Sequence, residues 1–285
     1  MFQKISVANR IGVWKPTREG LQPVSEEVPS ILLWDASHVQ RKLIVRDGSG
    51  GTSLLRFDAG HLTPSRRIGS SSSSSDISTA TLDDAGRRLA ISGNNRTGPV
   101  IEMWGWESDD FPARKLTEVK TRPTNQMAFA EGGRTLVTRH GSMMQVWDVR
   151  NDELVSRATF PEDQHQQFAI APDGVTVATS CYGDIRLWDL KSELQTPSFK
   201  FACHEAVAVA FSPNGRLLAG SSQRNFKGEV QIVNVANGVT QKRLSFPGPV
   251  NQLSFTDDGR HLVTGNANGT IYVVRLEEAP KSSAE

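Results

Sequence analysis

Residues 206–222, AVAVAFSPNGRLLAGSS, contain the pattern that decides the fold. Apolar residues run up to Phe211, a polar turn follows with Asn214 beside Gly215, and a second apolar run ends in small residues. Two extended apolar runs joined by a short Asn-Gly turn are the sequence signature of a β-hairpin. The segment therefore predicts two antiparallel strands.

The same hairpin pattern recurs along the chain. It is found again in LDDAGRRLAIS from Leu82, FAEGGRTLVT from Phe129, IAPDGVTVATS from Ile170 and FTDDGRHLVTG from Phe255. The turn glycines Gly86, Gly133, Gly174, Gly215 and Gly259 are spaced 47, 41, 41 and 44 residues apart. A period of this size is the signature of a repeat architecture.

A third strand follows each hairpin in step. The segments VIEMWGW, MQVWDVR, DIRLWDL, VQIVNVA and TIYVVRL place Trp104, Trp147, Trp188, Val233 and Val274 at intervals of 43, 41, 45 and 41 residues. A turn and a short fourth strand come next, as in ELVSRATF at 153–160. A four-stranded sheet of about 40 residues cannot bury both faces alone, so the sheets must stack on one another.

These repeats resemble WD repeats. Trp147-Asp148 and Trp188-Asp189 match the dipeptide that names the family, and the resemblance extends over residues 30–276. It implies an all-β fold, a β-propeller of four-stranded antiparallel blades. It also implies that the indole of each third-strand Trp donates a hydrogen bond to a hydroxyl on the second strand, as a buried Trp requires.

The resemblance gives candidate partners for these Trp side chains. Ser92, Thr138 and Thr179 occupy plausible hydroxyl positions for Trp104, Trp147 and Trp188, respectively. His204 matches the family's loop His, which is mostly missing elsewhere, and Val233 stands where the Trp of its own blade would be.

The spacing of the third-strand positions continues toward the N-terminus. Phe57 lies 47 residues before Trp104 and takes the third-strand position, and Trp14 lies 43 residues before Phe57 and takes the same position one unit earlier. Trp34, although followed by Asp35, lies 23 residues before Phe57 and belongs in a first strand. The Trp-Asp at 34–35 is therefore predicted to be an accidental match.

The count of third strands predicts seven blades in one domain over residues 1–285, with a partial blade at 1–28 and a disordered tail at 277–285. The last unit stops before its fourth strand. If residues 21–28 supply that strand, a ring of six blades with an extra N-terminal strand is the alternative. The chain is also compatible with being a piece of a longer propeller protein.

Composition narrows the class of protein. The 285 residues carry 32 Lys and Arg against 31 Asp and Glu, a net charge of +1, without a basic stripe that would favour a nucleic-acid partner. No apolar run has the length of a signal peptide or a membrane span. With only Cys181 and Cys203, the chain is expected to be cytoplasmic, without a disulfide framework and without a membrane partner.

The preferred function is a non-catalytic scaffold, a monomer or part of a larger complex, that binds a protein or peptide through loops at one end of the blades. The candidate contact residues are Asn95, Arg96, His140, Tyr182, His204, Arg224 and Phe226. They lie in loops and combine aromatic and Arg anchors with adaptable polar groups, as interface hot spots do.

A metal-dependent hydrolase or lactonase-like propeller is the alternative, but the expected channel positions Asp76, Asn125, Gln166, Ala206 and Asn251 carry too few charges. His and Cys residues lack the local pairing of a zinc site, so no metal and no cofactor are expected. The serine run at 70–75 is expected to be a flexible connector, with a phosphorylation-tuned loop beside Arg66 and Arg67 as the alternative.

Overall fold

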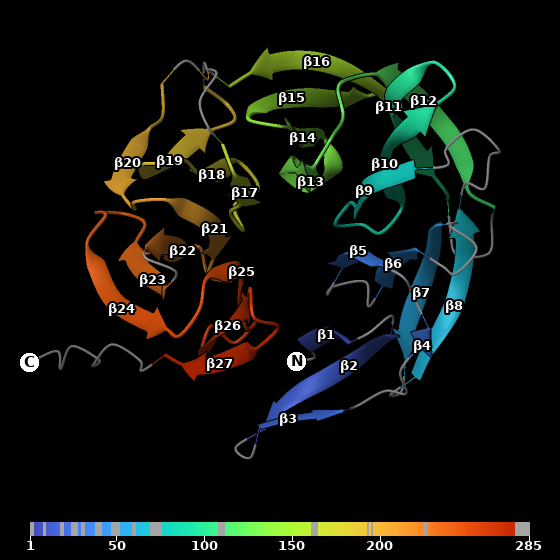
Figure 1. Ribbon diagram of the computed structural model, residues 1–285. Helices are drawn as coiled ribbons and strands as arrows, with labels where there is room; N and C mark the ends of the chain where they lie inside the picture. The colour runs from blue at the N-terminus through green and yellow to red at the C-terminus, as the bar shows by residue number, and fades with distance from the viewer. Residues whose placement is uncertain are drawn as a thin grey trace, which may run out of the picture. The chain divides into compact units, whose positions relative to one another are not determined.

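The computed structural model describes the chain apart from residues 1–2, 8–9, 18–19, 24–27, 30–31, 38–41, 47–51, 59–60, 69–75, 108–111, 161–164, 193, 195, 225–226 and 277–285. For much of the part before residue 77, it describes the backbone alone. The described strands form seven antiparallel sheets (Figure 1). Within the same residues, the only helical turn is at Glu131–Gly133, and no helix is long and apolar enough to cross a membrane.

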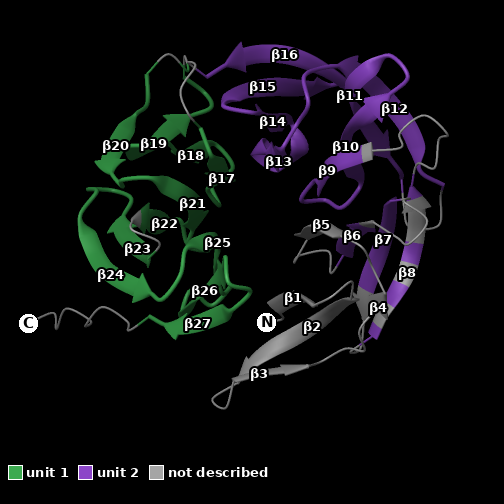
Figure 2. Cartoon of the chain, viewed as in Figure 1, with its two compact units in different colours: residues 1, 161–285 green, residues 2–160 purple. Residues whose placement is uncertain are grey.

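The chain divides into two compact units, coloured separately in Figure 2. The N-terminal unit covers residues 2–160 and the C-terminal unit residues 161–285. Each unit is built from consecutive sheets, and each sheet from strands that are consecutive in the sequence. The fold is therefore the all-β, four-stranded blade architecture of a WD-type β-propeller, while the number of blades stays a prediction.

The N-terminal unit holds four of the sheets. Their strands are β1 (Gln3–Val7), β2 (Arg10–Thr17), β3 (Gly20–Pro23) and β4 (Val28–Pro29); β5 (Leu32–Ser37), β6 (Lys42–Arg46), β7 (Thr52–Asp58) and β8 (His61–Ile68); β9 (Asp76–Leu82), β10 (Arg88–Asn95), β11 (Gly98–Gly105) and β12 (Arg114–Lys120); and β13 (Gln126–Ala130), β14 (Thr135–His140), β15 (Met143–Arg150) and β16 (Glu153–Thr159).

The C-terminal unit holds the other three. Their strands are β17 (Gln167–Ile170), β18 (Thr176–Ser180), β19 (Asp184–Asp189) and β20 (Phe199–Ala202); β21 (Ala206–Phe211), β22 (Leu217–Arg224), β23 (Lys227–Asn234) and β24 (Thr240–Phe246); and β25 (Val250–Phe255), β26 (His261–Asn266) and β27 (Ile271–Arg275). The last sheet has three described strands, whereas the other two sheets of the unit have four.

Strand order settles the position of the first Trp-Asp dipeptide. Trp34 lies in β5, the first strand of its sheet, and Phe57 lies in β7, the third strand. Trp14 lies in β2, which pairs with β1 on one side and with β3 and β4 on the other. The described part of residues 21–28 therefore pairs with the strand of Trp14.

The recurring glycines are required by the hairpin turns. Gly86, Gly133, Gly174, Gly215 and Gly259 have φ values of 65°, 84°, 72°, 68° and 67°, the left-handed region that glycine enters without steric cost. In the first of these turns, Oδ1 of Asp83 accepts hydrogen bonds from the backbone N–H groups of Arg87 and Arg88 at 2.8 and 3.0 Å. The acidic residues near these glycines therefore need no catalytic explanation.

Apolar side chains fill the spaces between consecutive sheets. In the N-terminal unit, Leu89 and Ile91 of β10 share a core with Ile44 and Leu54 of the preceding sheet, and the opposite face of β9–β12 packs against the sheet of Trp147. In the C-terminal unit, the β21–β24 sheet is covered in the same way on both faces. The first strands of neighbouring sheets lie side by side, β5 with β9, β9 with β13, β17 with β21 and β21 with β25.

Candidate functional site

The indole of Trp147 starts a buried chain of polar side chains. Nε1 donates to Oγ1 of Thr138 at 3.0 Å, and that oxygen lies 2.8 Å from Nε2 of His140. Nδ1 of His140 lies 3.2 Å from the carbonyl oxygen of Arg122 and 3.1 Å from Oγ1 of Thr124. Neutral His140 with the proton on Nδ1 satisfies the Trp, Thr and carbonyl contacts, and burial lowers the pKa of His140 accordingly. The predicted partner Thr138 is confirmed.

Trp188 starts a second chain with the same spacing. Its Nε1 donates to Oγ1 of Thr179 at 2.9 Å, which confirms the second predicted partner. Sγ of Cys181 lies 3.8 Å from that oxygen and 3.4 Å from Nδ1 of His165, whose ring meets the Trp188 ring edge-on. His165 and Cys181 are 16 residues apart, as are Thr124 and His140. In the sheet of Trp147, the His ends the second strand and its partner Thr124 precedes the first strand. In the sheet of Trp188, the His precedes the first strand and its partner Cys181 follows the second strand.

This arrangement changes the interpretation of two histidines. His140 is only 5% exposed and its ring is hydrogen-bonded within its own sheet, so the prediction that it contacts a partner is wrong. His165 is buried and takes the loop position before the first strand, which sequence reasoning assigned to His204 alone. The signal was present in the sequence, because His165 stands two residues before β17, as Thr124 stands two residues before β13.

Trp104 differs from the other two. Its Nε1 donates to Oε2 of Glu102 at 3.1 Å, two residues earlier on the same strand. The predicted partner Ser92 is wrong, because its Oγ has no hydrogen-bond partner among the described residues. Alternate residues of a strand face opposite sides of the sheet, and Ile91, not Ser92, pairs with Glu102 across the strands.

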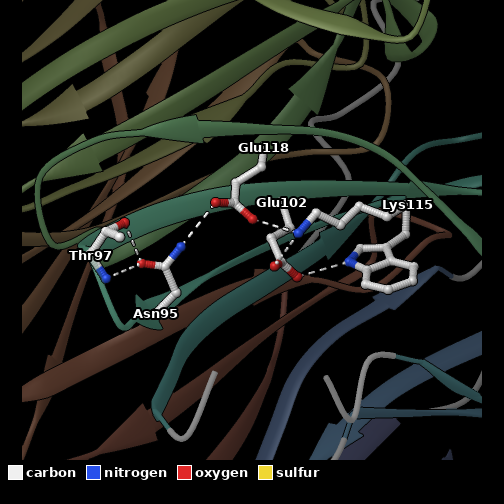
Figure 3. Close-up of polar contacts among 6 residues, drawn as sticks. Asn95, Thr97, Glu102, Lys115 and Glu118 are labelled. Carbon is white, nitrogen blue, oxygen red and sulfur yellow. Dashed lines mark hydrogen bonds and ion pairs between the residues drawn. The ribbon is translucent and has the colours of Figure 1, made fainter. Parts of the chain in front are cut away.

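The Glu102 carboxylate connects Trp104 to a loop. Figure 3 shows Glu102, Lys115, Glu118 and Asn95 in this path. Oε1 of Glu102 accepts from Nζ of Lys115 at 2.9 Å, and the same Nζ contacts Glu118. The hydrogen bond with Glu118 raises the pKa of Lys115 and lowers the pKa of Glu118. Glu118 also accepts from Nδ2 of Asn95 at 2.9 Å, so a continuous polar path joins the partly buried indole to the β10–β11 turn.

Two sheets replace the Trp with Val. Val233 pairs with Leu218, and the position of Thr138 and Thr179, two residues further along the second strand, is taken by Gly220. A Cβ at Gly220 would overlap the Cδ1 methyl of Ile185. In the sheet of Val274, the hydroxyl at the equivalent position is kept as Thr264, which pairs with Tyr272 across the strands and has a local contact with Asn266. Apolar packing thus replaces the indole network in the sheet of Val233.

The two Asp residues of the Trp-Asp dipeptides have different roles. Asp148 is paired with Arg157 of the fourth strand at 3.1 Å and with Arg150 at 2.6 Å. Oδ1 of Asp189 instead accepts from the backbone N–H of Lys191 at 2.8 Å. One Asp therefore joins two strands, whereas the other shapes a turn.

Three exposed side chains gather at one end of the C-terminal unit. Tyr182, 63% exposed, lies in the β18–β19 turn, and His204 and Glu205 lie in the β20–β21 connection. The backbone N–H of Glu205 donates to the carbonyl of Tyr182 at 2.6 Å, and the N–H of Gln223 donates to the carbonyl of Glu205 at 3.3 Å. We call Tyr182, His204 and Glu205 the loop cluster.

The other candidate contact residues are Asn95, Arg96, Arg224 and Phe226. Asn95 caps its own turn by accepting from Thr97, and the neighbouring Arg96 is exposed. Arg224 ends β22, where only the backbone is described, and Phe226 lies outside the described residues. The serine run at 70–75 also lies outside them.

Neither cysteine forms a disulfide, and both are buried. Burial raises the pKa of the Cys203 thiol to about 12, so the thiolate that reacts or binds metal is strongly disfavoured. Over the part of the chain that the structure describes, no three His, Cys, Asp or Glu side chains form a group that could hold a metal ion.

The sheets and their Trp contacts define a propeller of the WD type. The family model described as "WD domain, G-beta repeat" matches residues 195–227 and 240–274, which supports WD repeats in this part of the chain. The first match begins just before the outer strand β20 and the second at the outer strand β24, and both continue into the following sheet. Each match therefore combines the fourth strand of one sheet with the first strands of the next sheet, in which Val replaces the Trp.

Curated relatives agree with the family. The chain is 22% identical to telomerase protein component 1 of Mus musculus over 215 residues, 74% of this chain and 8% of that protein. It is 31% identical to U3 small nucleolar RNA-associated protein 15 of Schizosaccharomyces pombe over 101 residues, 34% of this chain and 20% of that protein. WD repeat-containing protein SL1-17 of Schistosoma mansoni is 28% identical over 137 residues, 46% of this chain and 44% of that protein. The matched region is thus less than half of each relative's length.

Proposed function

We propose that the protein is a non-catalytic interaction scaffold that binds a protein or peptide partner through the loop cluster. The observation that carries this proposal is an exposed aromatic ring on a fixed backbone. Tyr182 is exposed, while its turn is tied to the β20–β21 connection by Glu205 N–H to Tyr182 O at 2.6 Å and by Cys203 N–H to Gly183 O at 3.4 Å.

Such an anchor binds at low entropic cost. Tyr is enriched among interface residues that dominate binding energy, and a rigid loop has little freedom left to lose on association. The side chains of Tyr182, His204 and Glu205 form no hydrogen bond or ion pair with other described residues, so they are available to a partner. Asn95, Arg96, Arg224 and Phe226 remain proposed contacts.

Recovery of partners from cell extract tests the loop cluster. The wild-type protein, Tyr182→Ala and Val239→Ala are compared by quantitative mass spectrometry of the captured proteins. Val239 is a matched control because it is 58% exposed but lies in the β23–β24 turn. This turn is at the opposite end of β23 from the β22–β23 loop, beside which Gln223 bonds to Glu205 of the loop cluster. We expect a set of proteins that Tyr182→Ala loses about tenfold and Val239→Ala retains. If Tyr182→Ala recovers the same proteins in the same amounts as Val239→Ala, the proposed surface is refuted.

The non-catalytic part of the proposal has its own test. The relatives support a scaffold, whereas the alternative hydrolase requires a divalent metal. Elemental analysis of purified protein is expected to find less than one metal ion per chain. One stoichiometric bound metal that survives dialysis would contradict the scaffold proposal.

A further inference from the structure

The loop cluster contains a residue with a strained backbone. Among the described residues, four that are not glycine have a positive φ: Glu131, Asn151, Asp152 and Glu205, at 51°, 50°, 64° and 51°. A side chain in this left-handed region costs free energy, and asparagine enters the region more readily than most residues. The cost at the three acidic residues therefore has to be offset by something that their side chains do.

Structural contacts account for two of these acidic residues. The carboxylate of Glu131 lies 3.6 Å from the guanidinium of Arg157. The carboxylate of Asp152 pairs with Arg88 at 3.2 Å and with Arg114 at 3.4 Å, both from the neighbouring sheet. Cations of the protein itself therefore hold both carboxylates.

Glu205 is different from these two residues. Its side chain is exposed and forms no hydrogen bond or ion pair with another described residue. Strained backbone that persists in a folded protein is concentrated at sites that hold ligands. The carboxylate of Glu205 is therefore available to a partner, and no internal contact explains the strain.

The same turn lies beside an aromatic residue. Glu205 N–H donates to Tyr182 O at 2.6 Å, so the two Cα atoms are about 5–6 Å apart, as in a hydrogen-bonded pair of strand residues. Tyr182 is 63% exposed, and Glu205 is exposed as well. One long side chain of a partner can therefore reach both residues.

An aromatic ring beside a carboxylate favours a cation. The face of the Tyr182 ring attracts a cation through its quadrupole, and the Glu205 carboxylate accepts hydrogen bonds without donating any. Arginine fits this pair better than lysine, because a planar guanidinium stacks on a ring while its N–H edge donates to both carboxylate oxygens. Tyr and Arg are also enriched among the residues that dominate interface binding energies, and such residues tend to pair across an interface.

We propose that Tyr182 and Glu205 bind an arginine side chain of the protein or peptide partner. This inference rests on the proposed function, because it names the chemistry that the loop cluster recognises. It assigns the Glu205 carboxylate to recognition and not to the stability of the fold.

Two small molecules test this chemistry without a known partner. Nα-acetyl-arginine methylamide carries the guanidinium, and Nα-acetyl-citrulline methylamide replaces it with a neutral group of nearly the same shape. Each compound is titrated into the full chain, and the backbone amides of Tyr182, Gly183 and Glu205 are followed by NMR. We expect the arginine compound to bind about fivefold more tightly than the citrulline compound.

Three variants locate the site. Glu205→Gln keeps the size of the side chain and removes its charge, and Tyr182→Ala removes the ring. Glu153→Gln is the matched control, because Glu153 of β16 is another exposed glutamate that forms no ion pair with a described residue. Thermal unfolding shows whether each variant keeps its fold. The preference for the arginine compound should be lost in the two loop-cluster variants and retained in Glu153→Gln.

The same variants are compared in partner recovery from cell extract. The proteins that Tyr182→Ala loses should fall about fivefold with Glu205→Gln and remain with Glu153→Gln. If Tyr182→Ala loses proteins that Glu205→Gln retains, this inference is overturned while the scaffold proposal stands. If neither variant loses any protein, both are overturned. Equal binding of the two compounds to the wild-type protein also overturns the inference, because the site then does not distinguish a cation from a neutral group.

Discussion

Trp104 and Glu102 lie on the same strand, and the indole Nε1 donates to the Glu102 Oε2 at 3.1 Å. In the sheets of Trp147 and Trp188, the acceptor is a Thr on the neighbouring strand. In the sheet of Trp104, the position of this Thr is taken by Ile91, which pairs with Glu102 across the strands. The acceptor has therefore moved across one cross-strand pair, from the second strand to the third.

Glu102→Ala should destabilise the protein by roughly 1–2 kcal/mol, because it leaves a partly buried indole N–H without its acceptor and removes the ion pair with Lys115. The Glu102 residue that makes both contacts is 4% exposed. The change is measured as the free energy of unfolding in urea. Glu118→Ala, at a more exposed carboxylate of the same network, is the control and should cost less than about 1 kcal/mol.

Adding Ile91→Thr to Glu102→Ala should recover about 1 kcal/mol, since it restores the acceptor that the other two sheets use. In the wild-type background, Ile91→Thr should instead destabilise, because it removes a buried apolar group from the core next to Leu89. Additive effects of the two changes would argue against a shared role.

The swapped histidines predict a coupled pair. Thr124→His with His140→Cys would build the Trp188 arrangement into the sheet of Trp147, because both contacts span 16 residues. Each single change leaves a buried contact incomplete. The double variant should therefore be more stable than the sum of the single changes by about 1 kcal/mol in a double-mutant cycle. A coupling energy of zero would show that the two networks are not interchangeable.

His140 should make stability fall in mild acid. Burial lowers its pKa from 6.5, so below pH 6.5 the unfolded chain takes up a proton that the folded chain refuses. Its contribution is fully present above pH 6.5 and is lost as the pH falls toward the folded-state pKa, at up to about 1.4 kcal/mol per pH unit. Urea unfolding from pH 5 to 7.5 measures this slope, and His140→Gln should flatten it. Equal slopes for both proteins would contradict the assignment.

Features set by local sequence were predicted correctly, whereas features set by contacts between distant segments were not. Strands, turns and the first-strand position of Trp34 follow from periodicity and spacing, which are local. Two of the three Trp partners were also found, but Ser92 failed because a shift of one residue moves a side chain to the other face of a strand. Burial of His140 and the tie between Tyr182 and Glu205 depend on contacts between segments distant in sequence, which one sequence does not show.

Gly220 should not tolerate a side chain. Gly220→Ala would place a Cβ against the Cδ1 of Ile185 in a packed core, which should cost about 1–3 kcal/mol. Ile185→Val removes that methyl group, so the double variant should be more stable than Gly220→Ala alone. Thermal unfolding of the three variants checks both parts, and no rescue by Ile185→Val would place the clash elsewhere.

Glu205 should tolerate glycine unusually well. Its φ of 51° lies in the left-handed region, where a side chain is disfavoured and glycine is not. Relief of this strain offsets the greater freedom of glycine in the unfolded chain, so Glu205→Gly should change the free energy of unfolding by less than about 0.5 kcal/mol. Glu153→Gly, at an exposed position of β16, is the matched control and should cost about 1 kcal/mol. Because Glu205→Gly removes the carboxylate while the Tyr182 turn stays tied, lost partner recovery with this variant would reflect recognition and not unfolding. A loss of stability equal to that of Glu153→Gly would mean that the strained backbone is not present in solution.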